Sequence, residues 1–215
     1  MSPRLLDAAL AYRLEGLRGV WDIMAPHSVY RLIRFGRYVV FAQSTDAPEV
    51  APGPGVVIRR LTEQDWPALA GIVTQLDLAR FRWLVNRGHI CLLALRAGRP
   101  VGYAWVADRI GPDVTLCDFP LPPHAAYLWE LYVLPAERRS GVGSALASAR
   151  LRVARDRGFR EGWRMIAPGN RASLRALEKS GGSTTRMVGQ VRFLKLLSLM
   201  RVRLDGWPAP TASSS

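Results

Sequence analysis

Lysine is almost absent from this basic chain: only Lys179 and Lys195 stand among the 30 Lys+Arg of its 215 residues. Arginine therefore supplies nearly all of the positive charge, and with 17 Asp+Glu the formal net charge is +13. The charge is uneven, because residues 151–215 hold 13 Lys+Arg and only 4 Asp+Glu. This bias predicts a polyanionic ligand or partner for the C-terminal half, such as a phosphorylated cofactor, an acidic carrier protein, nucleic acid or anionic lipid.

Cysteine and histidine are also scarce. The two cysteines, Cys91 and Cys117, lie in apolar runs, which favours buried reduced thiols over a disulfide or a metal-binding pair. The three histidines, His27, His89 and His124, fall in no metal-binding spacing. The sequence therefore predicts neither a metal site nor a disulfide framework.

Long apolar runs are missing as well. No uncharged apolar stretch approaches the roughly 20 residues that a membrane-spanning helix needs, which predicts no transmembrane segment. The first 30 residues lack an apolar run after basic residues, so we predict no signal peptide. With an ordinary hydrophobic fraction of 49%, we expect a cytoplasmic protein with one globular domain and an added N-terminal element.

The distribution of proline and glycine suggests how the chain is organised. "STDAPEVAPGPG" is rich in both and reads as a linker, and the small and polar tail is predicted to be disordered. The predicted organisation is an N-terminal extension over 1–43, a linker over 44–55, a folded domain over 56–205 and a disordered tail over 206–215. Within the extension we expect one or two short amphipathic helices over 4–36 and a strand over 37–43.

The hydrophobic periodicity after the linker predicts alternating strands and helices. The expected elements are a strand over 56–61, a helix that a capping box starts at Thr62 and that continues through 69–76, a second helical stretch to about 85, a hairpin around "AGRP" at 97–100, a strand over 114–119, a buried strand over 126–135, a helix from Val142 to about Gly158, a strand over 161–168, a helix from Asn170 to Gly181 and a final strand in 191–204. The strand, helix and strand over 127–166 predict a βαβ unit with parallel strands and a right-handed crossover.

The turn "ERRSGVGSAL", residues 137–146, joins a buried strand to a helix. The first N–H groups of a helix lack intrahelical partners, and the helix dipole there favours anions. Glycines let a bulky ligand approach the backbone, so a phosphate suits this position. The turn fits neither the P-loop, since no Lys follows, nor the dinucleotide fingerprint, since Leu146 replaces the third glycine.

The pattern Arg138-x-x-Gly141-x-Gly143 follows a strand that ends in "YVLP", and "GNRASLRALEKSGG" begins at residue 169. This arrangement resembles the GNAT superfamily of acyl-CoA-dependent N-acyltransferases over about residues 56–200, most strongly over 127–181. The resemblance implies an α+β fold: a mixed, mostly antiparallel sheet flanked by helices, with a central parallel βαβ unit whose strands splay apart.

The resemblance also implies a cofactor site. The amides around the glycine turn would take the CoA pyrophosphate, the slot between the splayed strands would take the pantetheine arm, and Asn170 would contact the cofactor. The predicted cofactor-binding residues are Leu131, Tyr132, Val133, Arg138, Arg139, Ser140, Gly141, Val142, Gly143, Ser144, Asn170 and Ser173. Arg150, Arg171 or Arg175 could meet the ribose 3′-phosphate, and the sequence does not choose among them. No metal is implied.

Glu130 is the only charged residue between Tyr127 and Leu134. Burial would raise its pKa and suit it to the role of general base, whereas a wet strand end or a neighbouring arginine would leave it without that role. The family's usual general acid is a tyrosine seven residues after the motif asparagine, and here that position is Leu177. The phenylalanine that usually follows the closing glycine is replaced by Gly182. Tyr132 is our candidate substitute acid, Tyr127 a second, and both could instead be core or slot lining.

Two further features are open to two readings. His124 could reach the acceptor site or be a solvated loop residue. Arg31, Arg34 and Arg37 have helical spacing, which fits either a basic flap for an acidic carrier protein or membrane surface, or a packed extension with a solvated face. We expect His89 and Cys91 to be structural.

The leading hypothesis is an enzyme that transfers an acetyl group from acetyl-CoA to a primary amine of a small molecule or peptide, by direct attack on the thioester. The alternatives are a transferase for longer acyl chains or for an acyl-carrier-protein donor, and a catalytically idle CoA-binding module. A homodimer is one assembly that we consider. A nucleic-acid partner is disfavoured, because no helix-turn-helix or RNA-binding signature is present. The acceptor cannot be identified from the sequence, although the resemblance places its pocket in residues 63–108.

Overall fold

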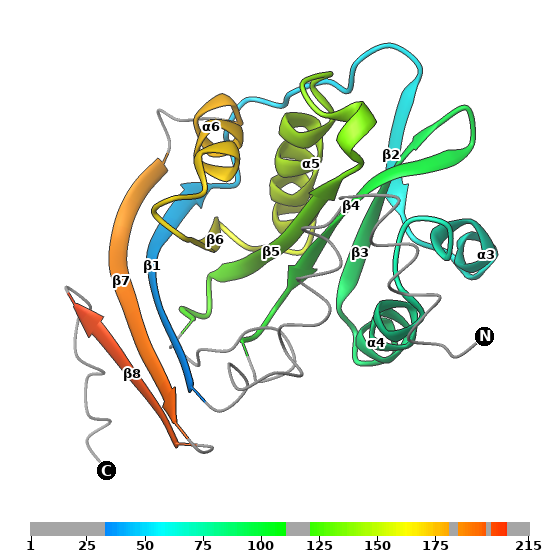
Figure 1. The fold of residues 1–215 in the computed structure, drawn as a ribbon. Helices are drawn as coiled ribbons and strands as arrows, with labels where there is room; N and C mark the ends of the chain where they lie inside the picture. The colour runs from blue at the N-terminus through cyan, green and yellow to red at the C-terminus, as the bar shows by residue number, and fades with distance from the viewer. Residues whose placement is uncertain (1–32, 111–120, 181–184, 197–198, 206–215) are drawn as a thin grey trace.

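An eight-stranded mixed sheet forms the frame of the molecule in the computed structural model, which describes residues 33–110, 121–180, 185–196 and 199–205. The strand order is β2-β3-β4-β5-β6-β1-β7-β8 (Figure 1). The strands are β1 (Ile33–Ser44), β2 (Val56–Arg60), β3 (Ile90–Arg96), β4 (Arg99–Ala107), β5 (Ala125–Val133), β6 (Glu161–Ile166), β7 (Thr185–Leu196) and β8 (Leu199–Asp205). The helices are η3 (Glu63–Asp65), α3 (Trp66–Leu69), α4 (Gln75–Asn86), η4 (Pro135–Glu137), α5 (Val142–Asp156) and α6 (Arg171–Lys179).

The predicted parallel βαβ unit is confirmed. β5 and β6 are parallel, α5 connects them, and all other neighbouring strands in the sheet are antiparallel. The parallel pairing covers only three positions, the last of which is Tyr127 opposite Trp163. Beyond this point the two strands separate, so the predicted splay is present and opens toward the C-terminal end of β5.

Helices cover both faces of the sheet (Figure 1). α3 and α4 pack on one face, where Phe81 and Trp105 meet edge to face at 4.9 Å in a large apolar cluster. α5 packs on the other face, where Leu128 and Leu146 belong to a second cluster, and α6 lies beside α5. Gly162 of β6 lets α5 approach, because a Cβ there would lie 2.8 Å from Leu151 Cδ2. No helix in the described part of the chain is long and apolar enough to cross a membrane.

The N-terminal strand β1 lies between β6 and β7 and is antiparallel to both. The strand predicted over 37–43 is therefore confirmed, but the helix predicted to reach residue 36 is wrong for 33–36. Arg34 and Arg37 both lie in strand β1, so the helical face that their spacing predicted does not form there. The run of β-branched and aromatic residues in Ile33–Phe41 favours a strand, and the free edge of β6 offers a partner. The rest of the predicted helical region lies outside the described residues.

Residues 45–55 join β1 to β2 without helix or strand. This segment runs along α5: the Val50 N–H donates to Ser148 Oγ at 2.9 Å, and Glu49 forms ion pairs with Arg152 and Arg155 at 3.3 and 2.8 Å. The proline- and glycine-rich composition thus produces an irregular connection that is tied to the α5 face.

The helix predicted through residues 69–76 is interrupted. α3 ends at Leu69, and α4 starts anew after Thr74, whose Oγ1 accepts from the Asp77 N–H at 3.0 Å. Helical spacing placed Leu76 on the buried face, whereas its side chain is 72% exposed. Gly71 and the capping preference of Thr74 break the helix, because a threonine side chain serves an N-terminus better than a helix interior.

Most other predicted elements are confirmed. The hairpin around "AGRP" is β3 and β4, α5 is followed by Gly158 at φ +87, and Asn170 caps α6. The capping box is present, since the Thr62 N–H donates to Asp65 Oδ2 at 2.7 Å. The single final strand is instead an antiparallel pair, β7 and β8. The predicted strand over 114–119, Cys117 and the tail lie outside the described residues.

Candidate active site

A cavity of about 1200 Å³ opens where β5 and β6 separate. It extends from the glycine turn before α5 to the last paired residues of the two strands. Its walls come from the C-terminal half of β5, from β6, from the start of α5 and from α6. The cavity therefore coincides with the slot that the splay was predicted to open.

The glycine turn holds the start of α5 open toward this cavity. Gly141 takes a left-handed conformation at φ +86, and the preceding Arg139 is also left-handed at φ +69. The first helical hydrogen bond runs from the Ala145 N–H to the Gly141 carbonyl at 3.0 Å. The amides of residues 142–144 thus precede the regular bonding of α5, and with the helix dipole they form a ready anion site.

The predicted cofactor-binding residues gather around the cavity. All of them line it except Ser140 and Val142. Val142 is fully buried, and Ser140 is exposed, with its hydroxyl donating to the Glu137 carbonyl at 2.6 Å. At the far wall, Asn170 Oδ1 accepts from the Ser173 N–H at 3.1 Å, so both residues are held at the start of α6.

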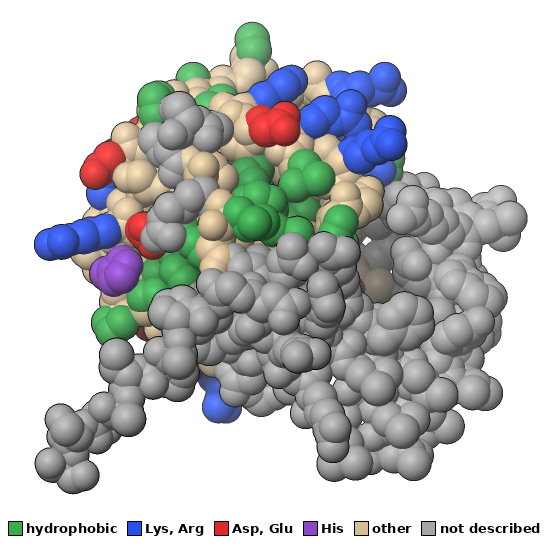
Figure 2. All heavy atoms as spheres, turned by 90° about the vertical axis from the view of Figure 1, so that its left-hand side faces the viewer, with side chains coloured by type: hydrophobic (Ala, Val, Ile, Leu, Met, Phe, Trp, Pro, Cys, Tyr) green, Lys and Arg blue, Asp and Glu red, His purple; other side chains and the backbone are tan. Residues whose placement is uncertain are grey.

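Basic side chains surround the outer part of the cavity. Arg175 and Lys179 of α6 are exposed and line it, as are Arg138 and Arg139 of the turn. Figure 2 shows Lys and Arg side chains gathered on one part of the face seen from the side of α6. Of the three arginines considered for a ribose phosphate, Arg175 has the position that suits a solvent-facing anion, whereas Arg150 is buried.

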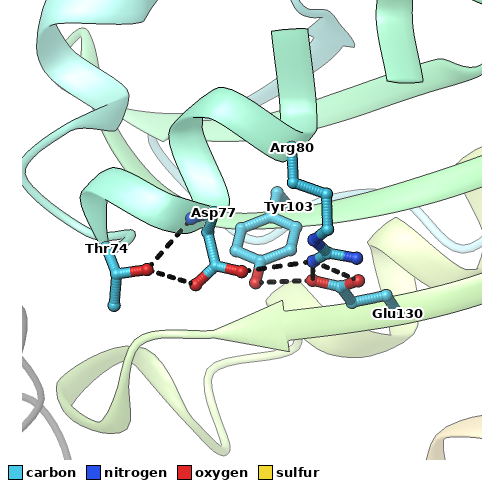
Figure 3. A network of polar contacts seen from close by, with 5 residues as sticks. All are labelled: Thr74, Asp77, Arg80, Tyr103 and Glu130. Atoms are coloured by element: carbon cyan, nitrogen blue, oxygen red, sulfur yellow. Dashed lines mark hydrogen bonds and ion pairs between the residues drawn. The ribbon is translucent and has the colours of Figure 1, made fainter. Parts of the chain in front are cut away.

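Glu130 also lines the slot, at a distortion of β5. Two residues of β5, Glu130 and Leu131, oppose the single residue Ala104 of β4, so the strand carries a β-bulge. Glu130 itself has φ +38, a conformation that costs free energy for a residue with a side chain. The bulge turns its carboxylate toward α4 (Figure 3).

Two side chains hold that carboxylate. Arg80 Nη2 donates to both Glu130 oxygens at 2.7 and 2.8 Å, and the Tyr103 hydroxyl donates to Oε1 at 3.1 Å. Arg80 is linked in turn to Asp77 Oδ1 at 3.4 Å, and Thr74 Oγ1 donates to Asp77 Oδ2 at 2.8 Å (Figure 3). The network joins the N-terminus of α4 to the bulge of β5.

Burial raises the pKa of Glu130 above the ordinary value of a carboxyl, and the Arg80 ion pair offsets only part of this rise. Burial, with the charge of Glu130, also raises the pKa of Tyr103, so this phenol stays a hydrogen-bond donor. The structure therefore contains both features that we considered for Glu130. An arginine neighbours the carboxylate, and the carboxyl still binds a proton more readily than a solvated one.

Comparison with known proteins shows which family the chain belongs to. The sequence model described as the Acetyltransferase (GNAT) family matches residues 57–182. The chain belongs to this family. Among curated proteins, no sequence matches this GNAT protein significantly.

Solved structures share the fold of this GNAT protein. A Drosophila protein is 17% identical with a TM-score of 0.57, and the match covers 86% of this chain and 68% of that one. A putative GNAT acetyltransferase from Novosphingobium aromaticivorans is 18% identical with a TM-score of 0.50, and here the match covers 74% of this chain and 63% of that one. The GNAT protein thus spans less than two thirds of the latter. These likenesses concern the fold alone.

The residues considered for acid catalysis fall in different places in this GNAT protein. Tyr132 lines the cavity, and its ring stacks on Tyr103 with centroids 5.4 Å apart. Tyr127 is buried in the core and also lines the cavity, and Leu177, at the family's usual tyrosine position, is buried as well. His124 is half exposed, lies 3.6 Å from Glu161 and does not line the cavity.

His89 and Cys91 are buried in the core, as expected for structural residues. Burial raises the pKa of the Cys91 thiol well above its ordinary value, which keeps it protonated and unreactive. Within the described ranges, no group of three or more His, Cys, Asp or Glu side chains could hold a metal ion.

Sequence reasoning missed three side chains of this site. Arg80 and Tyr103 contact Glu130 from 50 and 27 residues away, so no local pattern relates them to it. Arg164 lines the cavity from β6 and is buried. A signal for Arg164 was available, because a charged residue within the apolar strand "EGWRMI" rarely lies inside a protein without a ligand or a partner.

Proposed function

We propose that this protein is an N-acyltransferase that uses an acyl-CoA donor and a primary amine of a small molecule or peptide as the acceptor. One observation carries the proposal: a single slot has an anion site at the start of α5 at one end and the Glu130 carboxylate beside the other. The family membership supports acyl transfer, and the geometry supports the division of the site into a donor half and an acceptor half.

The donor half fits CoA. The amides of residues 142–144 and the dipole of α5 would hold the pyrophosphate, with Arg138 and Arg139 adding charge-assisted hydrogen bonds. Arg175 or Lys179 would meet the 3′-phosphate. β5 and β6 no longer pair beyond Tyr127, and Tyr132 and Val133 line the slot, so an extended arm would run beside β5 there as a neighbouring strand does.

The acceptor half is built on α4, β4 and the bulge. A free amine would attack the thioester carbonyl, form the C–N bond and release the CoA thiolate, while Glu130 takes the surplus proton. Its raised pKa suits a base that works near neutral pH. Arg80 and Tyr103 orient the carboxylate, and Tyr132 is our candidate to protonate the departing thiolate.

Several finer statements stay predictions. These are the acetyl group as the cargo, the roles of Glu130 and Tyr132, the cytoplasmic location, a homodimer and an acyl-carrier-protein donor. An idle CoA-binding module is the main alternative function, because Leu177 occupies the position of the family's usual acid.

The deciding experiment has two stages. The melting temperature is first measured with and without CoA, and we expect CoA to raise it by binding the folded state. Thiol release from acyl-CoA donors is then measured against a panel of amines, polyamines and peptides. Turnover that saturates with one amine class supports the enzyme, whereas CoA binding without turnover on any acceptor favours the idle module.

Glu130→Gln tests the base. We expect the turnover rate at saturating acceptor to fall by about 10²- to 10⁴-fold, the usual contribution of a general base. Glu49→Gln is the matched control, because Glu49 is an exposed carboxylate that pairs only with arginines of α5 in the described structure. Equal rates for Glu130→Gln and wild type would remove Glu130 from the mechanism and leave the proposed function standing.

A further inference from the structure

Two buried arginines lie at the inner end of the slot. Arg150 of α5 and Arg164 of β6 are each only 4% exposed, and both line the cavity. Arg150 Nη1 donates to the Trp129 carbonyl at 3.1 Å, and Arg164 Nη2 donates to Gln43 Oε1. The Nε–H groups of both have no hydrogen-bond acceptor among the described residues.

Neither arginine has a carboxylate partner in the described part of the chain. Burial lowers the pKa of Arg150, and the like charge of Arg164 lowers it further. Burial also lowers the pKa of Arg164, to about 10. A buried charge without a counter-ion is costly, and two of the same sign are costlier. An anion in the cavity that both line would offset this cost, and guanidinium groups bind carboxylates with good geometry.

The position of the pair selects which part of a ligand would supply the anion. Arg164 directly follows Trp163, the last residue of β6 that pairs with β5. Arg150 lies eight residues into α5 from Val142, roughly 12 Å from the phosphate-binding turn. The pair is therefore too deep for the pyrophosphate or the solvent-facing 3′-phosphate. A donor that enters at the turn and runs along β5 from Val133, past Glu130, to Tyr127, roughly 20 Å, would place the far end of its acyl group near these arginines.

We propose that Arg150 and Arg164 bind a carboxylate at the far end of the donor's acyl group, so that the donor is the CoA thioester of a short dicarboxylic acid. This inference rests on the proposed function, since it requires CoA in the slot. The transfer itself is unchanged: the amine nitrogen bonds to the thioester carbonyl carbon, the C–S bond breaks, and the distal carboxylate passes intact to the product. An acetyl group would leave both guanidinium groups without an anion.

The test compares donors of equal chain length. CoA, acetyl-CoA, butyryl-CoA and succinyl-CoA are titrated into the wild-type protein by calorimetry. We expect succinyl-CoA to bind at least tenfold more tightly than butyryl-CoA, which has the same four carbons and no carboxylate. Equal affinities for these two donors would overturn the inference while leaving the acyltransferase standing. Failure of every CoA species to bind would instead overturn the proposed function.

Arg150→Gln and Arg164→Gln locate the effect. We expect each variant to lose the tenfold preference for succinyl-CoA and to keep the wild-type affinity for CoA itself, which also reports that the variant is folded. Arg175→Gln is the matched control, and we expect it to weaken all four species by the same factor. The assignment would be refuted if both buried-arginine variants kept the preference for succinyl-CoA over butyryl-CoA. It would also be refuted if they lost as much affinity for CoA as for succinyl-CoA. If neither variant folds, the wild-type comparison of succinyl-CoA with butyryl-CoA decides the matter alone.

Discussion

Replacing Gly143 by alanine separates ligand binding from stability. An alanine Cβ at Gly143 would lie 3.7 Å from Val133 Cγ2 and 4.0 Å from Leu131 Cδ2, which are ordinary contacts. The residue is in the first turn of α5, where alanine is the better helix former. The folded protein should therefore keep its stability or gain up to about 1 kcal/mol.

Gly143 lines the cavity at the proposed pyrophosphate site, so the same methyl group would take up space there. If it displaces a phosphate oxygen from one amide, the complex loses one hydrogen bond to a charged group, about 1.5–3 kcal/mol. The Kd for CoA should then rise roughly 10- to 150-fold. Calorimetric titration gives the Kd, and thermal unfolding of the free protein gives the stability.

Gly158→Ala is the matched control at the other end of α5. Gly158 has φ +87, and an alanine Cβ there would have open space within 4 Å, so the cost of alanine is backbone strain alone, about 1–2 kcal/mol. This variant should melt about 2–8 °C lower and bind CoA as the wild type does, once folded. If Gly143→Ala leaves the CoA affinity unchanged, the assignment of the turn is refuted. The assignment is also refuted if both variants lose CoA affinity in proportion to their losses of stability.

Three further predictions concern other parts of the molecule. Because burial raises the pKa of Glu130, the rate should rise with pH as this carboxyl ionises, and a pH–rate profile of Glu130→Gln should lack that limb. Hydrogen bonds from Arg59, and then from Thr62, hold the pKa of Asp65 well below its usual value, so its contribution is present above pH about 4 and lost in acid. Asp65→Asn should therefore cost about 2 kcal/mol in urea unfolding at pH 7, and this cost should shrink steadily as the pH falls below about 4, to well under its pH 7 value at pH 2; a cost at pH 2 equal to that at pH 7 would contradict the ion pair's role. Gly162→Ala should destabilise the protein by about 1–3 kcal/mol, since its Cβ would meet Leu128 Cδ1 at 2.5 Å, and an unchanged melting temperature would show that the α5 face has room to spare.

The fold was predictable wherever one local signal dominated. The apolar run of β5, the glycine turn and the helix ending before Gly158 are all encoded by neighbouring residues. The interruption between α3 and α4 was not, because Leu69, Ile72, Val73 and Leu76 fit helical spacing equally well. Ile72 and Val73 lie in an irregular turn, and their side chains are buried all the same. An apolar position that will be buried therefore does not reveal the backbone conformation that buries it.

The candidate site likewise has one half that local sequence signals predicted and one half that they did not. Most of its donor half is continuous in sequence around the glycine turn, and the residues predicted there line the cavity except Ser140 and Val142. Its acceptor half depends on Arg80 and Tyr103 meeting Glu130 across three elements, and the inner end depends on α5 and β6 bringing Arg150 and Arg164 to one cavity. Such pairs arise from tertiary packing and leave no periodic pattern.

The place of β1 in the sheet has a consequence for how the chain folds. β1 precedes the other strands in synthesis, yet Gln43 bonds to Arg164, 121 residues later in the chain. Contacts of such high sequence separation slow folding, because the closure entropy of a long loop is lost before the contact can form. Until β1 is inserted, β6 has an open edge that another chain could pair with. We therefore expect slow refolding with concentration-dependent aggregation, and a chaperone that shields strand edges should raise the yield more than one that only stabilises the finished fold.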